Sequence, residues 1–214
     1  MNILISGGAK NGKSYYAQRL AKQMAEETGH PLYYIATMIP HDEEDHARIR
    51  RHVSERAGWG FETLERGTDL MGLLGPAESE AADLGQGDSV GQSQPVGPGP
   101  VDPQGAFLLD SVTALLSNEM FDEQGRFDKG AAERVAKDCT AFAKATGNTV
   151  FVSDYIYGDA DRYDALTEEY RRALATVDRE LAKVCDQVIE VSAGMIEKWK
   201  PAGEDRTEEE YEVR

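Results

Sequence analysis

The first fourteen residues contain a glycine-rich loop whose residue types and spacing suit phosphate binding. The pattern G-x-x-x-x-G-K-[ST] is met by eight consecutive residues: Gly7, Gly8, Ala9, Lys10, Asn11, Gly12, Lys13 and Ser14. Backbone N–H groups of such a loop surround a phosphate, and the N-terminus of the following helix adds partial positive charge. Lys13 is the catalytic cation expected at the β- and γ-phosphates, and Ser14 is a Mg²⁺ ligand. The alternative is a glycine turn that only joins a strand to a helix.

Two acidic residues at the ends of apolar runs are further candidates. Asp110 follows the run 106–109 and is predicted to hold Mg²⁺ directly or through water. Its alternative role is the N-cap of the helix expected after Ser111. Asp154 follows the run 149–152 in a similar position, but acids at strand ends are common, so a structural role is the stronger interpretation there.

His52 is the candidate nucleophile. It belongs to a polar segment, 42–56, whose apolar spacing predicts a solvent-exposed helix and which also carries His46. Arg48 and Arg56 lie four residues to either side of His52 and therefore share its helix face. Guanidinium groups in these positions could hold a phosphate beside a nucleophilic imidazole. From the residues alone, a solvated side chain is the stronger interpretation of His52.

The elements that position these residues alternate between strand and helix. Apolar runs predict strands at 1–6, 32–36, 106–110, 149–152 and 188–191, separated by segments with helical apolar spacing. This alternation predicts an α/β fold of the P-loop class, with a mainly parallel sheet covered by helices on both faces. Ligands of such sheets bind beyond the carboxyl ends of the strands. The residues expected there are Gly7, Thr37, Asp110, Ser153-Asp154 and Ser192.

The length of 214 residues fits a single nucleotide-binding domain, expected to span residues 1–200. Residues 75–105 are rich in Gly, Pro, Gln, Ser and acidic side chains, which predicts a flexible insertion. The acidic tail 201–214 is expected to be disordered for the same reason.

The composition limits the partners and the compartment. A formal net charge of −16 disfavours nucleic acid and anionic membranes as partners, yet a phosphate site can work inside an acidic protein. Cys139 and Cys185 lack metal-type spacing and are expected to be buried, reduced thiols. No apolar run approaches the ~18 residues of a membrane span, and no signal peptide is visible, which favours the cytoplasm. The chain also lacks N-K-x-D and a D-x-x-G after a strand, which argues against a signalling GTPase.

Several motifs, in order, resemble the adenosylcobinamide kinase/adenosylcobinamide-phosphate guanylyltransferase family. They are I-L-I-S-G-G-A-K-N-G-K-S at 3–14, Y-I-A-T at 34–37, A-R-I-x-x-H at 47–52, L-L-D-S-V-T at 108–113, and Asp42, Glu44, Arg56, Thr63, Glu65, Ser117 and Asn118. The resemblance covers most of residues 1–195.

The resemblance implies a RecA-like fold and two reactions. Members of the family phosphorylate the hydroxyl of adenosylcobinamide with ATP or GTP, and then transfer GMP from GTP through a guanylylated histidine. His52 matches that histidine, and we expect Thr37, Arg48 and Glu65 to contact nucleotide. The resemblance also implies a homotrimer with nucleotide and corrinoid ligands.

Three departures from the family pattern keep two alternatives open. The chain has Arg56-Ala57 and Phe61 for Arg-Pro and Trp, Asp154-Tyr155-Ile156 for Asn-Glu-Val, and Asp178-Arg179 for Asn-Gln. We expect these changes to lie away from the phosphate loop and near the second substrate or the guanosine. The alternatives are a corrinoid or other small-molecule kinase without guanylyl transfer, and a nucleotide-dependent regulatory or assembly protein.

Overall fold

The computed structural model describes residues 1–75, 101–122, 126–158 and 161–200, and its centre is one seven-stranded sheet. The strand order is β3-β2-β4-β5-β1-β6-β7, with β7 antiparallel to β6 and every other neighbouring pair parallel. The strands are β1 Ile3–Gly7, β2 Leu32–Ala36, β3 Glu62–Glu65, β4 Ala106–Asp110, β5 Thr149–Asp154, β6 Gln187–Ser192 and β7 Met195–Lys200. The helices are α1 Lys13–Thr28, α2 Glu43–Glu55, the 3-10 helix η1 Leu70–Leu74, α3 Val112–Met120, α4 Ala131–Thr146 and α5 Ala165–Val184.

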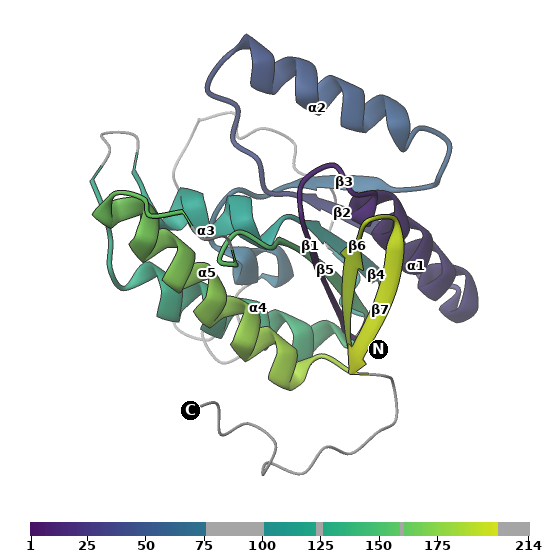
Figure 1. Cartoon of the computed structure of the whole chain (residues 1–214). Coiled ribbons are helices and arrows are strands. Elements are labelled where there is room, and N and C mark those ends of the chain that lie inside the picture. The colour runs from purple at the N-terminus through teal and green to yellow at the C-terminus, as the bar shows by residue number, and fades with distance from the viewer. Residues whose placement is uncertain (76–100, 123–125, 159–160, 201–214) are drawn as a thin grey trace, which may run out of the picture.

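Helices cover both faces of the sheet, which confirms the predicted fold class. On one face, Ala17, Ala21 and Met24 of α1 belong to one buried apolar cluster. The cluster also contains Ile3 and Ile5 of β1 and side chains of β2, β4, β5 and β6. On the other face, α3, α4 and α5 enclose a larger cluster that includes Leu4 of β1. Figure 1 shows these two layers, with α2 set apart above the sheet. The central strands are buried on both faces, and for this reason their sequences are continuous apolar runs.

Short polar side chains fix where several helices begin. Asp42 accepts a hydrogen bond from the Asp45 N–H at the start of α2 (2.9 Å), and Ser111 accepts one from Ala114 at the start of α3 (3.1 Å). Each cap satisfies an N–H group that has no partner within its helix. The Ser111 cap also shows that the alternative role of Asp110 as the cap of α3 is wrong.

Two strands were not predicted, so the expected count of five was too low. In β3 only Leu64 is buried, and a strand of four residues with a single apolar side chain shows no hydrophobic periodicity in the sequence. β7 is largely exposed and returns antiparallel to β6 through Ala193 and Gly194, which have φ values of 50° and 77°. This two-residue turn has the positive φ values typical of a tight hairpin.

Part of the predicted insertion can be placed. Residues 76–100 and the tail 201–214 lie outside the described residues, so their predicted flexibility stays a prediction. Residues 101–105 lead into β4: Val101 packs on the core, and the Asp102 N–H donates to the Tyr33 hydroxyl (3.1 Å). Both cysteines are buried free thiols, as predicted, and burial raises the pKa of Cys185 to about 12. Over the described ranges, no helix combines the length and apolar character of a membrane span.

Candidate functional site

The phosphate loop joins β1 to α1 in the strand-loop-helix context that its motif requires. Lys10 and Gly12 have φ values of 56° and 91°, in the left-handed region where glycine is strongly preferred. The Asn11 side chain fastens the loop by donating to the Val191 carbonyl of β6 and accepting from the Lys13 N–H (3.1 Å). These two hydrogen bonds fix the loop conformation in the absence of a phosphate.

Lys13 is directed toward a carboxylate at the end of β5. Its Nζ lies 2.6 Å from Asp154 Oδ1 and donates to the Gly8 carbonyl at 3.1 Å. The sheet register places Asp154 beside Gly7, because β5 lies between β1 and β4. The expectation that the 154–156 departure lies away from the phosphate loop is therefore wrong. Sequence alone could not reveal this contact, since it depends on the strand order.

A cavity of about 620 Å³ extends from α2 to the carboxyl ends of the central strands. It gathers four predicted site residues, Arg48, His52, Glu65 and Asp110. His52 is half-buried and Arg48 is exposed, so both can reach a ligand in the cavity. Asp154 lines the same cavity, and through its ion pair with Lys13 it joins this space to the phosphate loop.

Tyr34 links the end of α2 to the predicted metal ligand. Its ring lies 3.7 Å below the Arg56 guanidinium, and its hydroxyl donates to Asp110 Oδ2 at 3.0 Å. Arg56 is only 7% exposed and also donates to the Thr63 hydroxyl (3.2 Å), so a cation–π contact and a hydrogen bond hold it in place. Tyr34 was missed as a site residue because its position in an apolar run suggested only a core role.

Thr37 follows β2 and is fully buried. Its hydroxyl donates to the Ser111 carbonyl (2.8 Å) and accepts from the Ser111 N–H (2.7 Å). These two bonds tie β2 to the start of α3 at the edge of the cavity. A nucleotide contact of Thr37 stays a prediction, and the observed bonds give it a positioning role.

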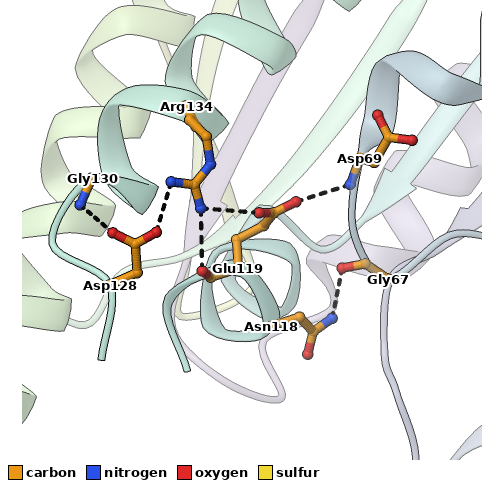
Figure 2. Close-up of polar contacts among 7 residues, drawn as sticks. All are labelled: Gly67, Asp69, Asn118, Glu119, Asp128, Gly130 and Arg134. Atoms are coloured by element: carbon orange, nitrogen blue, oxygen red, sulfur yellow. Dashed lines mark hydrogen bonds and ion pairs between the residues drawn. The ribbon is translucent and has the colours of Figure 1, made fainter. Parts of the chain in front are cut away.

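A network of hydrogen bonds joins α3 to the segments that follow β2 and β3 beside the cavity. Asn118 donates to the carbonyls of Thr37 (2.7 Å) and Gly67 (2.8 Å), and Glu119 accepts from the Asp69 N–H (2.9 Å). Figure 2 shows how Arg134 of α4 completes this network by contacting Glu119 and Asp128. The loop after β3 is thereby fastened to α3 and α4. The sequence signalled only Asn118, through the family motif.

Asp178 of α5 supports the end of β5 from the other face of the sheet. Its Oδ2 accepts hydrogen bonds from the hydroxyls of Ser153 (2.9 Å) and Tyr157 (3.0 Å), and the residue is 6% exposed. Burial is the main cause that raises the pKa of Asp178 to about 6, and the two hydroxyls partly offset it. Asp178 lines a second cavity, of about 670 Å³, and its expected place near the second substrate stays a prediction.

We predict that Asp178→Asn stabilises the protein at pH 8. The folded state holds the Asp178 proton more tightly than the unfolded chain, so this carboxyl stabilises the fold fully only below about pH 4, and that stabilisation is lost as the pH rises through 6. Asparagine can still accept from Ser153 and Tyr157 without a buried charge. The expected gain in unfolding free energy is about 1–3 kcal/mol at pH 8 and close to nothing near pH 4. Thermal unfolding at both pH values, with exposed Asp161→Asn as the charge-matched control, checks this; a gain that is equal at both pH values contradicts it.

Comparison with known proteins places the chain. A family model described as cobinamide kinase / cobinamide phosphate guanyltransferase matches residues 3–84 and 100–198. The chain is 27% identical to the bifunctional adenosylcobalamin biosynthesis protein CobU of Salmonella typhimurium, covering 91% of this chain and 97% of the relative. It is 28% identical to the bifunctional protein CobP of Pseudomonas aeruginosa, with 91% and 95% covered. Among solved structures, it is similar to the flagellar accessory protein FlaH of Methanocaldococcus jannaschii (TM-score 0.45, 12% identity, 94% of this chain and 78% of that chain covered).

The family match extends over both parts of the candidate site, since it includes the phosphate loop, α2 with His52, and the strand ends that carry Asp110 and Asp154. The chain therefore belongs to the cobinamide kinase / cobinamide phosphate guanyltransferase family.

Proposed function

We propose that this protein phosphorylates adenosylcobinamide with ATP or GTP and then transfers GMP from GTP to the phosphorylated corrinoid through His52. The observation that carries the proposal is the shared cavity. It contains His52 and Arg48 from α2 as well as Asp154, whose carboxylate binds the Lys13 ammonium of the phosphate loop. His52 and the carboxylates of Asp110 and Asp154 thus line one cavity, and the ion pair of Asp154 connects this cavity to Lys13 of the phosphate loop.

The kinase step draws on the phosphate loop. Loop N–H groups bind the phosphates, and Lys13 leaves Asp154 to stabilise the charge on the transferred phosphoryl group. Because Lys13 is 7% exposed and hydrogen-bonded to Gly8, little conformational freedom is lost when it turns to the phosphate.

The residues also suit Mg²⁺. The hydroxyl of Ser14 at the first turn of α1 and the Asp110 carboxylate are oxygen ligands, which Mg²⁺ prefers, and Tyr34 orients Asp110. Within the described ranges no cluster of three or more His, Cys, Asp or Glu side chains could cage a metal. One or two protein oxygens combined with phosphates and water is the usual arrangement for Mg²⁺. The ion would neutralise charge on the phosphates.

The guanylyl transfer draws on α2. The His52 imidazole attacks the α-phosphorus of GTP, pyrophosphate leaves with the electrons of the broken P–O bond, and a phosphoramidate to GMP forms. Arg48 lies four residues before His52 on the same helix and can neutralise the α-phosphate. The corrinoid phosphate then attacks this phosphorus and releases His52.

Two finer features belong to the proposal. The family resemblance implies a homotrimer, which sedimentation would test. The two buried free thiols suit the reducing cytoplasm, where we place the enzyme.

A two-part assay of the wild-type protein tests the function. With ATP, Mg²⁺ and cobinamide, we expect ADP and phosphorylated corrinoid. With GTP labelled at the α-phosphate, we expect acid-labile label on the protein that a chase with cobinamide phosphate removes. Phosphorylation without protein label would support the kinase-only alternative, and nucleotide binding with neither reaction would support a regulatory protein.

A further inference from the structure

Two aromatic side chains pack against each other beside the phosphate loop, and neither has a part in the reactions described above. Tyr15 follows Ser14 in the first turn of α1 and is 60% exposed. Trp59 lies in the loop between α2 and β3. The centroids of the two rings are 5.5 Å apart and their planes are inclined at 78°, which is an edge-to-face contact. This contact joins the loop after α2 to the first turn of α1.

The backbone around Trp59 fixes the position of its ring. The Trp59 N–H donates to the carbonyl of Arg56 (3.1 Å), and Arg56 is 7% exposed and lines the 620 Å³ cavity. Gly58 and Gly60, on either side of Trp59, have φ values of 80° and 89°, which glycine adopts without strain. Figure 1 shows the loop passing from α2 down beside α1 to β3. Trp59 is therefore tied to a residue of the cavity and also packs on α1.

A nucleotide on the phosphate loop must extend its nucleoside past the first turn of α1. Lys13 is expected at the β- and γ-phosphates, and the backbone N–H groups at the start of α1 are expected at the phosphates nearer to the ribose. Tyr15 belongs to that same first turn, so its exposed ring lies beside the path from the phosphates to the base.

The edge-to-face contact leaves ring faces open for a third ring. The ring that contributes its edge keeps both faces open at this contact, and the other ring keeps one. A purine stacked on such a face is bound through its π surface and not through the donors and acceptors that distinguish one base from another. Adenine and guanine would therefore be bound alike, as a kinase step that uses ATP or GTP requires.

We propose that Tyr15 and Trp59 form the platform on which the purine base stacks when ATP or GTP occupies the phosphate loop, an inference that rests on the proposed function. The two rings contact the base and take no part in making or breaking bonds. They therefore determine the affinity for the nucleotide and not the rate of the chemical step.

The fluorescence of Trp59 provides the first test. The chain has two tryptophans, and Trp199 lies on β7, at the opposite edge of the sheet from β3, so Trp199→Phe leaves Trp59 as the only indole. In this variant, ATP and GTP with Mg²⁺ should quench the emission of Trp59, because a stacked base contacts the indole ring. Tripolyphosphate with Mg²⁺ carries no base and should leave the emission unchanged when it binds.

The affinity for ATP provides the second test. Tyr15→Ala and Trp59→Ala should each raise the Kd for ATP about 5- to 100-fold in calorimetric titrations, the loss expected for one stacking contact. Tyr15→Phe keeps the ring, and Trp199→Ala removes an exposed indole elsewhere, so both should stay within about twofold of wild type. The Kd for tripolyphosphate should be the same in all four variants. The kcat of cobinamide phosphorylation at saturating ATP should stay within about threefold of wild type.

Three results would overturn the inference: ATP that binds without quenching Trp59, a Kd for ATP within about twofold of wild type in both alanine variants, or an equal loss of ATP and tripolyphosphate binding. The last result would show that the two rings only support the phosphate loop. The proposed function is tested separately. If ATP binds and quenches Trp59 but cobinamide is not phosphorylated, the proposed function fails and the inference stands, whereas wild-type protein that binds no ATP contradicts both.

Discussion

Lys13→Ala is expected to abolish cobinamide phosphorylation while leaving the fold intact. The Lys13 ammonium is the cation placed to stabilise charge on the transferred phosphoryl group, and such a preorganised contact is worth on the order of 10²–10³-fold or more in kcat. The side chain contacts Asp154 and the Gly8 carbonyl and is absent from both apolar clusters, so its removal should not unfold the protein. Initial rates of ADP release with ATP and cobinamide measure the effect.

The control for this variant is Lys22→Ala, which removes a half-buried ammonium from the same helix. It should keep wild-type rates. Thermal unfolding of both variants separates lost catalysis from lost folding. Kinase activity of Lys13→Ala within about tenfold of wild type would contradict the catalytic role assigned to the phosphate loop.

His52→Ala is expected to remove all labelling by GTP and to spare the kinase step. Alanine has no nucleophile, so the covalent intermediate cannot form, and GMP transfer should fall by orders of magnitude. Kinase activity should stay within about threefold, because in the described part of the chain no hydrogen bond or ion pair joins the half-buried His52 side chain to Lys13, Ser14 or Asp110. Label retention on filters measures the first reaction, and ADP release measures the second.

Two other histidines sharpen this test. His41 is exposed and is not among the residues that line the cavity, so His41→Ala should label normally. His46 lies in the same helix and does line the cavity, which makes it the competing nucleophile. Labelling lost in His46→Ala but kept in His52→Ala would transfer the role to His46.

The elements that could be predicted from the sequence are those whose residue pattern lies within one continuous segment. The phosphate loop, the runs of β2 and β4 and the helix 42–56 are local patterns, and each appears where predicted, at Leu32–Ala36, Ala106–Asp110 and Glu43–Glu55 among others. Asp110 lines the cavity, as predicted by the rule that ligand sites lie at the carboxyl ends of parallel strands, whereas His52, Arg48 and Glu65 were placed at the site by the family resemblance.

Contacts that depend on the order of the strands in the sheet could not be predicted from the sequence. The Lys13 to Asp154 ion pair exists because β5 inserts between β1 and β4, and no local pattern encodes that order. Tyr34 shows the same limit, since its ring packs like a core residue while its hydroxyl reaches Asp110. Asp178 was noted as a departure from the family, but its hydrogen bonds to Ser153 of β5 and to Tyr157, which follows β5, could not be predicted because they join segments that are separated along the chain.

Mapping the guanylylated residue tests the central assignment most directly. Trypsin separates His52 from the other three histidines, because cleavage after Arg51 and Arg56 releases His52-Val53-Ser54-Glu55-Arg56, whereas His30, His41 and His46 fall together in residues 23–48. After incubation with GTP and Mg²⁺, and digestion at alkaline pH to preserve the phosphoramidate, mass spectrometry should find GMP on the 52–56 peptide. GMP on the 23–48 peptide, or on no peptide of a protein that binds GTP, would contradict the role of His52.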